Sequence, residues 1–161
     1  MIFICTGSRQ FQFNRLLEKV DELVERGYIT EEVFAQTAHS NYIPKSYSYK
    51  DFLSAEEFSE YQKKADLIIS HAGTGALIGA LKLGKQVIAV PRLHKYGEHS
   101  DDHQLEISNL LANEGYLRQV IDIDDLPGVI ELCKEQPIFR KYERPSNIVS
   151  IIEEFIQKNA K

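Results

Sequence analysis

The chain has 161 residues, of which 27% are charged and 43% apolar, and its formal net charge is −5. This length suits one domain with its own hydrophobic core, so we expect a single domain over residues 1–161. The composition is that of a water-soluble globular protein, and no apolar run approaches the roughly twenty residues that would span a bilayer. The negative charge argues against general binding to nucleic acid or to anionic lipid.

The first residues, Met-Ile-Phe-Ile-Cys-Thr, predict a strand and not a signal peptide, because they lack a basic leader and a small-residue cleavage site. We therefore expect a cytoplasmic chain. The two cysteines, Cys5 and Cys133, lie far apart and have no metal-ligand spacing, which predicts buried, reduced thiols. His99 and His103 straddle a predicted helix start without a matching third ligand, so we expect no metal site.

The opening strand leads through Gly7 and Ser8 into a helix. Apolar residues recur at helical spacing from Phe13 to Val24, and Gly27 stands where a left-handed cap would end this helix. Residues 32–37 then predict a second strand.

The middle of the chain is the least regular part. Segment 41–51 is rich in tyrosine and broken by Pro44, so a third strand is poorly defined there. Ser54 and Glu57 then form a capping box, in which the serine oxygen accepts from the third helical N–H and the glutamate reaches back. This motif predicts a helix over 55–65.

A glycine turn follows the next apolar run. Residues 67–69 predict a strand that closes with Ser-His-Ala-Gly-Thr-Gly at 70–75, and Thr74 can cap a helix that ends at Gly84. The first N–H groups of a helix lack internal partners and the peptide dipoles add positive charge there, so this turn suits a phosphate group. A strand at 86–90 completes a parallel unit, whose ligands collect at the carboxyl ends of the strands.

The last part of the chain continues the alternation. It predicts an exposed loop at 91–101, a helix from about Asp102 to Glu114, a strand at 117–121, a helix marked by Leu126, Val129, Ile130 and Cys133, and a terminal helix at about 146–158. We expect the apolar stripe of the terminal helix to pack on this domain's own sheet. Packing on another chain, for example in a homo-oligomer, is the alternative.

Strand and helix alternate from end to end, which predicts an α/β fold: a three-layer, Rossmann-like sandwich with a mostly parallel six-stranded sheet. Four basic residues stand in a stretch without acids: Lys82, Lys85, Arg92 and Lys95. They indicate either a local basic rim for a small anionic ligand or an ordinary solvated surface.

Missing motifs exclude several chemistries. Ser8-Arg9-Gln10-Phe11 follows Gly7, where a dinucleotide fingerprint would need further spaced glycines. The chain has no G-x-x-x-x-G-K-[ST] phosphate loop and no G-x-S-x-G nucleophile elbow. We therefore do not expect a dehydrogenase, an ATP- or GTP-hydrolysing enzyme, or a hydrolase with that elbow.

Four motifs follow one another between residues 67 and 117: HAGTG at 71–75, LGK at 83–85, PR at 91–92 and D-x-HQ-x-E at 101–106. Together they resemble the C-terminal, donor-binding domain of glycosyltransferase family 28. The likeness is closest to a half-sized subgroup, which comprises the small catalytic subunit of the dolichol-linked UDP-GlcNAc transferase and similar bacterial exopolysaccharide glycosyltransferase subunits. The opening MIFICTGS and FNRLLEKVDEL also resemble this subgroup, whereas 28–52 and the residues beyond about 135 carry little of the likeness.

The resemblance implies one half of a GT-B fold, in which two Rossmann-like domains face each other and one holds the nucleotide sugar. Since the chain has room for one domain, a second, membrane-anchored polypeptide would supply the acceptor domain and bring this chain to the membrane. The implied reaction is inverting and needs no metal or other cofactor. It transfers a hexose or N-acetylhexosamine from a UDP-sugar to a polyprenyl-diphosphate-linked acceptor, in exopolysaccharide or glycolipid synthesis. The alternative is a non-catalytic nucleotide-sugar-binding or scaffold subunit that stimulates a partner transferase.

The resemblance also implies roles for single residues. The catalytic set would be His71, whose imidazolium could offset charge on the leaving phosphate, together with His103 and Glu106. The binding set would be Gly73, Thr74 and Gly75 for the diphosphate, Gly7 and Ser8 at the facing edge of the cleft, Arg92 against uracil, and Asp102 and Gln104 for sugar hydroxyls. Several positions have a purely structural alternative: a capped helix at Thr74, a tight turn at Gly7, a surface arginine at Arg92, a helix cap at Asp102 and a buried strand-end histidine at His71.

One position departs from the family pattern. Near the end of the helix after the glycine turn, family members place a carboxylate that holds both ribose hydroxyls, and this chain has Gly79 there. Losing such an acceptor would remove about 1–3 kcal/mol of hydrogen bonding. Either another acidic residue substitutes, the nucleotide is held differently, or donor binding is weak until the partner arrives. No base for the acceptor hydroxyl can be assigned, and we expect it on the other subunit.

Overall fold

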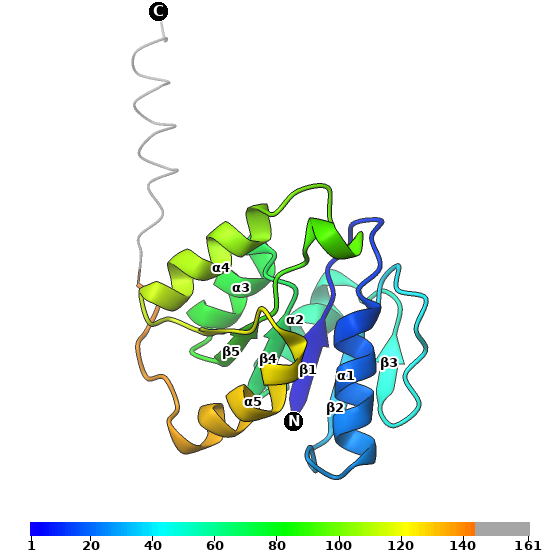
Figure 1. Ribbon diagram of the computed structural model, residues 1–161. Coiled ribbons are helices and arrows are strands. Elements are labelled where there is room, and N and C mark those ends of the chain that lie inside the picture. Colours follow the sequence, from blue (N-terminus) through cyan, green and yellow to red (C-terminus); the bar gives the residue numbers. More distant parts are fainter. Residues whose placement is uncertain (144–161) are drawn as a thin grey trace, which may run out of the picture.

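The computed structural model describes residues 1–143, in which strands and helices alternate around one sheet (Figure 1). The strands are β1 (Ile2–Cys5), β2 (Val33–Gln36), β3 (Ser48–Lys50), β4 (Leu67–Ser70), β5 (Gln86–Ala89) and β6 (Arg118–Gln119). The helices are α1 (Asn14–Glu25), α2 (Ala55–Lys64), α3 (Thr74–Lys82), α4 (His103–Asn113) and α5 (Leu126–Glu135), with short 3-10 turns η1 (His94–Tyr96) and η2 (Ile123–Asp125). The terminal helix predicted at about 146–158 lies outside the described residues.

All six strands are parallel, in the order β3-β2-β1-β4-β5-β6. The chain first adds β2 and β3 on one side of β1 and then crosses to place β4 on the other side. Ile2 pairs with Leu67 and Cys5 with Ser70, so β1 and β4 end at the same level. This reversal of direction opens a crevice beyond the carboxyl ends of β1 and β4, which is where ligands of such sheets bind.

Each face of the sheet carries its own apolar layer. Ile2 and Ile4 pack with the buried sides of α1 and α5, whereas Phe3 and Cys5 pack with residues of α2, α3 and α4. Helices therefore cover both faces (Figure 1), and the predicted three-layer sandwich with a six-stranded sheet is confirmed. Within residues 1–143, no helix has the length and apolar character that a membrane span needs.

The structure confirms the least certain strand and corrects one local expectation. Segment 41–51 contains an edge strand, β3, which pairs with β2 from Ser48 onward. The loop at 91–101 is exposed only in part, because Pro91, Arg92, Leu93, Glu98 and His99 are buried.

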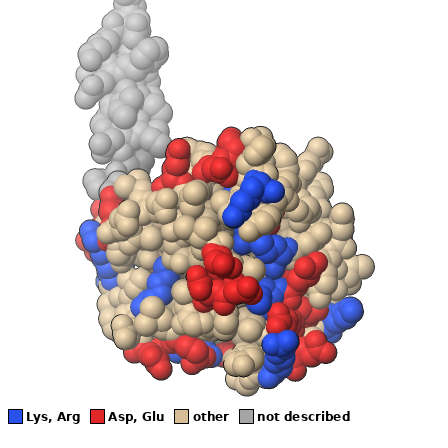
Figure 2. Space-filling view, in the orientation of Figure 1, with Lys and Arg blue, Asp and Glu red and all other residues tan. Residues whose placement is uncertain are grey.

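The predicted basic rim does not form. Lys82 ends α3 and Lys85 precedes β5, so both lie at the amino end of that strand, whereas Arg92 and Lys95 follow its carboxyl end. Basic and acidic side chains are interspersed on the face seen in Figure 2. The charge that matters for a ligand therefore has to come from single residues at the crevice.

The buried carboxylate of Asp21 fastens segment 41–47 to α1. It accepts hydrogen bonds from the Tyr42 hydroxyl (2.6 Å) and from the backbone N–H groups of Lys45 (2.9 Å) and Ser46 (2.7 Å). Burial alone would raise the pKa of this carboxyl, but the hydrogen bonds together hold it below its ordinary value. One side chain thus orders a stretch that shows no regular pattern in the sequence.

We expect Asp21→Ala to lower the free energy of unfolding by about 2–4 kcal/mol, because three donors lose a charged acceptor. Hydrogen exchange in 41–47 should become faster. Urea denaturation and hydrogen exchange followed by mass spectrometry measure the two effects. Glu18→Ala, at an exposed acidic position of the same helix, is the matched control and should stay within about 0.5 kcal/mol of the unsubstituted chain. Equal effects of the two substitutions would contradict the role given to Asp21.

Candidate functional site

His71 lies in the crevice, just beyond the ends of β1 and β4. Its ring is buried, and Nδ1 is 3.1 Å from the carbonyl oxygen of Cys5. The ring fills the space that side chains at two glycines would need: a Cβ would stand 2.6 Å from Nε2 at Gly7 and 2.2 Å from it at Gly73. Gly7 also has a φ of +90°, which residues with a Cβ rarely adopt. Both glycines are therefore required so that two turns of the chain can pass the imidazole ring.

The hydrogen bond fixes the protonation of His71. A carbonyl oxygen only accepts, so Nδ1 carries the hydrogen and Nε2 is an acceptor in the neutral ring. Burial first, and then the positive charge of Arg92, lower the pKa of His71 to about 4. The ring is therefore neutral at pH 7. The predicted imidazolium, which would offset charge on a leaving phosphate, is corrected to a buried, neutral strand-end histidine.

The turn after His71 presents the N-terminus of α3 to the crevice. Ala72 is buried and has a φ of +65°, a left-handed conformation that is strained for a residue with a Cβ. Gly73 is the N-cap, Thr74 is the first helical residue, and no side chain caps this end. The prediction that Thr74 caps the helix is therefore wrong. The N–H groups of the exposed Thr74 and Gly75 are left for a ligand, because the first turn of a helix has no internal acceptor for them.

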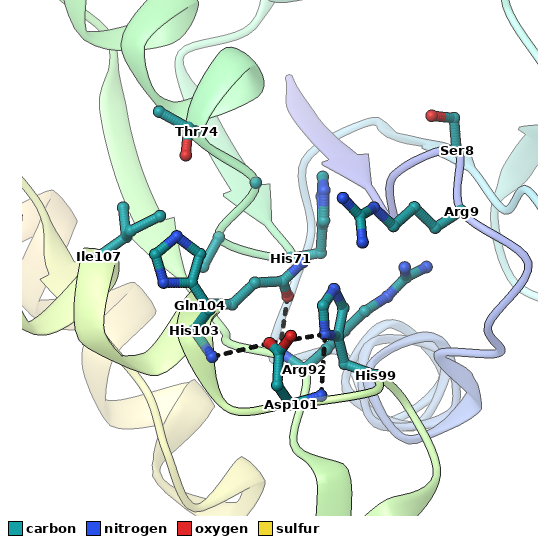
Figure 3. Close-up of a pocket in the computed structure, with 12 residues that line it drawn as sticks. Ser8, Arg9, His71, Thr74, Arg92, His99, Asp101, His103, Gln104 and Ile107 are labelled. Carbon is teal, nitrogen blue, oxygen red and sulfur yellow. Dashed lines mark hydrogen bonds and ion pairs between the residues drawn. The ribbon is translucent and has the colours of Figure 1, made fainter.

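A first cavity of about 280 Å³ opens on one side of this turn (Figure 3). Its wall combines the loop after β1, the turn after β4 and the segment between β5 and α4. Most of its lining is polar: Ser8, Arg9, His71, Thr74, Arg92, His99, Asp101, His103 and Gln104. The lining holds two arginines but one carboxylate, and that carboxylate, Asp101, already lies 3.0 Å from His99 and accepts from the His103 N–H. The first cavity therefore has an excess of positive charge, which favours an anionic ligand.

A buried ion pair holds the segment after β5 against α1. The Glu98 side chain is fully buried, and its carboxylate pairs with Arg15 through two contacts of 2.9 Å. The same carboxylate accepts from the Leu93 N–H (3.0 Å). Glu98 makes no hydrogen bond to Arg92, although both residues belong to one short segment.

The start of α4 braces this segment from the other side. Asp102 accepts from the His94 N–H (2.9 Å) and makes no side-chain cap for α4, so its carboxylate stabilises the loop and not the helix end. Gln104 is buried, lines the first cavity, and accepts from the Arg92 N–H (3.1 Å). Of the two residues predicted for the sugar hydroxyls, Gln104 lines the first cavity and Asp102 does not.

The predicted contact of Arg92 with uracil is corrected. The side chain is 0% exposed, its Nη2 donates to the carbonyl oxygen of Phe11 (3.1 Å), and the guanidinium lies 5.7 Å from the ring centre of Phe13. It has no open face on which a base could stack. Nε and Nη1 have no hydrogen-bond partner among the described residues. Burial lowers the pKa of Arg92 to about 10, so the group remains charged at pH 7.

The two other predicted catalytic residues, His103 and Glu106, differ in their position relative to the first cavity. His103 lines the first cavity, whereas Glu106, one turn further along α4, is not part of that lining. Both side chains are exposed, and Nδ1 of His103 lies 3.3 Å from Oε2 of Glu106. Glu106 is therefore placed to orient His103 and not to touch a ligand in the cavity.

A second cavity of about 530 Å³ lies on the other side of the same turn and shares Ser8, His71, Gly73 and Thr74 with the first. The starts of α2 and α3 add mainly apolar or small groups to its wall: Leu53, Ala55, Phe58, Gly75 and Ala76. Gln36, at the end of β2, donates to the Gly7 carbonyl oxygen (3.4 Å) and accepts from the Leu53 N–H (3.2 Å). This amide fixes the two loops that form the sides of the second cavity.

Gln62 of α2 occupies the space beside Gly79. Its Nε2 donates to the carbonyl oxygen of Ala76 (3.0 Å), and its Oε1 lies 3.2 Å from the place where a Cβ on residue 79 would stand. A larger side chain at position 79 would press on this amide. Glycine at 79 and glutamine at 62 therefore fit together.

Sequence reasoning found the turn, Ser8 and Gln104 but missed several lining residues: Arg9, His99 and Asp101 in the first cavity, and Gln36, Leu53 and Phe58 in the second. The polar run GEHSDDHQ before α4 was a signal for His99 and Asp101. No sequence signal indicated Gln36, because the sequence does not distinguish a buried amide at the end of a strand from any other polar strand residue.

A parallel sheet with an open helix N-terminus and a cationic cavity at its topological switch point is the arrangement in which α/β domains bind anionic ligands. Residues 1–158 match the glycosyltransferase family 28 C-terminal domain, and the chain belongs to this family. It is 33% identical over 105 residues to the UDP-N-acetylglucosamine transferase subunit ALG13 of Homo sapiens, a match that covers 65% of this chain and 8% of that protein. It is 34% identical over 88 residues to the subunit of the same name from Yarrowia lipolytica, covering 55% of this chain and 40% of that protein. The chain thus spans less than half the length of these relatives.

Solved structures show the same fold at low sequence identity. MurG from Acinetobacter baumannii superimposes with a TM-score of 0.67 and 18% identity, over 98% of this chain and 49% of that one. The solution structure of ALG13 superimposes with a TM-score of 0.57 and 17% identity, over 98% of this chain and 94% of that one. The chain therefore has the fold of one half of a GT-B glycosyltransferase.

The buried, neutral state of His71 predicts a loss of stability in mild acid. Its pKa is about 4 in the folded chain and 6.5 for an ordinary histidine, so between these values the unfolded chain binds a proton that the folded chain does not. The contribution of His71 to the free energy of unfolding is fully present above pH 6.5. It is lost as the pH is lowered toward 4, which reduces the free energy of unfolding by about 3 kcal/mol. Urea denaturation at a series of pH values measures this change. His71→Gln should flatten the pH dependence and the exposed His103→Gln should retain it; a wild-type slope in His71→Gln would contradict the assignment.

Proposed function

We propose that this chain is the donor-binding, catalytic subunit of a two-chain inverting glycosyltransferase that takes a hexose or N-acetylhexosamine from a UDP-sugar. The observation that carries the proposal is the uncapped N-terminus of α3, which stands between a polar, cationic cavity and a more apolar one. Membership of the family and similarity to proteins named as UDP-N-acetylglucosamine transferase subunits support it. Among candidate sugars, N-acetylglucosamine therefore comes first.

The two cavities suit the two ends of such a donor. The second cavity offers Leu53, Phe58 and Ala76 as apolar surface for the uracil ring. The N–H groups at Thr74 and Gly75 would then bind the diphosphate, since they carry the positive end of the helix dipole. The sugar would extend into the first cavity, where Gln104 and His103 can hydrogen-bond to its hydroxyls.

We further propose that the acceptor is bound by a separate, membrane-anchored subunit, which holds a polyprenyl-diphosphate-linked saccharide of exopolysaccharide or glycolipid synthesis. Similarity to proteins named as transferase subunits supports a second component. The base that activates the acceptor hydroxyl would belong to that subunit. We also propose that transfer needs no metal ion, so EDTA should leave it unchanged.

The first test isolates one backbone donor. Proline fits the first position of a helix and Gly73 already has the extended conformation that precedes proline (φ −69°, ψ 128°), so Thr74→Pro removes the N–H of residue 74 and keeps α3. Thr74→Ala removes the hydroxyl but keeps this N–H and is the matched control. We expect isothermal titration with UDP to show affinity at least about 10-fold lower for Thr74→Pro than for Thr74→Ala, which is the effect of one hydrogen bond to a charged group.

Equal UDP affinity in the two variants would place the diphosphate elsewhere, and no UDP binding to the wild-type chain would contradict a donor site. Substitution of Gly73 cannot serve this purpose, because a Cβ there would collide with the His71 ring.

A second test concerns turnover. We expect the purified chain alone to transfer little sugar from UDP-N-acetylglucosamine, because it holds one of the two faces of the active site. Adding the proposed membrane-anchored subunit should raise the rate by orders of magnitude in an assay with radiolabelled donor and a membrane extract. Efficient transfer by the isolated chain would contradict the two-chain proposal. Stimulation of the partner that persists in Thr74→Pro would favour a scaffold role.

A further inference from the structure

Arg92 carries a buried positive charge that no carboxylate among residues 1–143 pairs with directly. Its guanidinium is fully buried, and two of its N–H-bearing nitrogens, Nε and Nη1, lack a hydrogen-bond partner among residues 1–143. Leaving charged donors unsatisfied in the interior is costly, so these two nitrogens call for a partner from outside the described residues, such as an anion or water.

The nearby carboxylates are already engaged. Glu98 gives both oxygens to Arg15 and accepts in addition from the Leu93 N–H. Asp101 is held by His99 and by the His103 N–H. Neither carboxylate hydrogen-bonds to Arg92, although Glu98, six residues further along the same segment, is near enough to attract its charge.

The unpaired charge belongs to the first cavity. Arg92 lines this cavity together with Arg9 and His99. Figure 3 shows the guanidinium groups of Arg92 and Arg9 on the same side of His71, opposite Thr74 and Ile107. Two like charges at one wall repel each other, so an anion between them would stabilise both. The backbone contact of Arg92 is to Phe11, in the loop whose residues Ser8, Arg9 and Gln10 are exposed.

We propose that Arg92 binds the diphosphate group of a ligand in the first cavity and supplies the positive charge that balances it there. The inference rests on the proposed function for the location of the ligand. A diphosphate can come from two sources in such an enzyme, the nucleotide donor or the lipid-linked acceptor, and the chemistry that Arg92 recognises is the same for both.

Arg92→Met tests this assignment, because methionine has a similar length without charge or donors. We expect the affinity for UDP, measured by NMR titration of the full chain, to fall at least about 10-fold, while the affinity for uridine stays within about 2-fold. The ligand-free variant should melt at the wild-type temperature or above it, because an unsatisfied buried charge is removed. Arg26→Met removes an exposed arginine near the end of α1 and is the control for net charge. It should change neither affinity.

Geranyl diphosphate, titrated in parallel, distinguishes the two sources. Arg92-dependent binding of UDP assigns the residue to the donor. Arg92-dependent binding of geranyl diphosphate without UDP binding assigns it to the acceptor, and then the inference stands while the proposed donor site fails.

Three outcomes would overturn the inference. Equal UDP affinity in the wild type and in Arg92→Met would leave the proposed function intact but give Arg92 no part in it. Equal losses of UDP and uridine binding, together with a lower melting temperature, would show that Arg92 only anchors the loop at Phe11. Failure of the wild-type chain to bind either diphosphate would contradict both the inference and the proposed donor site.

Discussion

The imidazole ring of His71 lies where the strand order of the sheet reverses, between β1 and β4. His71 follows the last residue of β4, its ring hydrogen-bonds to the end of β1, and the ring fills the space beside Gly7 and Gly73, which have no side chains. The turn after the ring leads directly into α3. The position of the open helix N-terminus, and of both cavities beside it, therefore depends on one buried, neutral side chain.

Around this point polar side chains hold the loops. Gln36 holds the loops after β1 and before α2, and Asp102 and Gln104 hold the segment after β5, in each case by hydrogen bonds to the backbone. An ion pair between Glu98 and Arg15 ties the segment after β5 to α1. These contacts fix the loops around the crevice, where the backbone N–H groups at the start of α3 and the charged side chains of the first cavity are the groups that can bind a ligand.

The fold was largely predictable because its signals are local and periodic. The capping box at Ser54 and Glu57, the apolar runs of β4 and β5 and the helical spacing of α1 all formed as expected. β3 was poorly defined because its three residues are all exposed and show no alternation. The segment that carries β3 is ordered by Asp21, twenty or more residues away, and no local pattern reports such a contact.

The site was predictable where it depends on the backbone and not where it depends on burial. The composition of the glycine turn alone predicts a helix N-terminus. The protonation of His71 and the burial of Arg92 arise from tertiary packing. A sequence motif that contains these residues therefore predicts neither the charge of the imidazole ring nor the exposure of the guanidinium. Asp102 illustrates the same limit, since its place before α4 predicts a cap while its carboxylate reaches back to His94.

The pairing of Arg15 with Glu98 has a practical consequence for redesign. The segment between β5 and α4 supplies much of the first cavity, so it is a natural piece to exchange between relatives when a different sugar is wanted. A transplanted segment that brings Glu98 into a chain without Arg15 would bury a lone carboxylate next to Arg92, and the two would neutralise each other. The modular unit of this domain is therefore the segment together with the first turn of α1, and the two should be inherited or grafted as one.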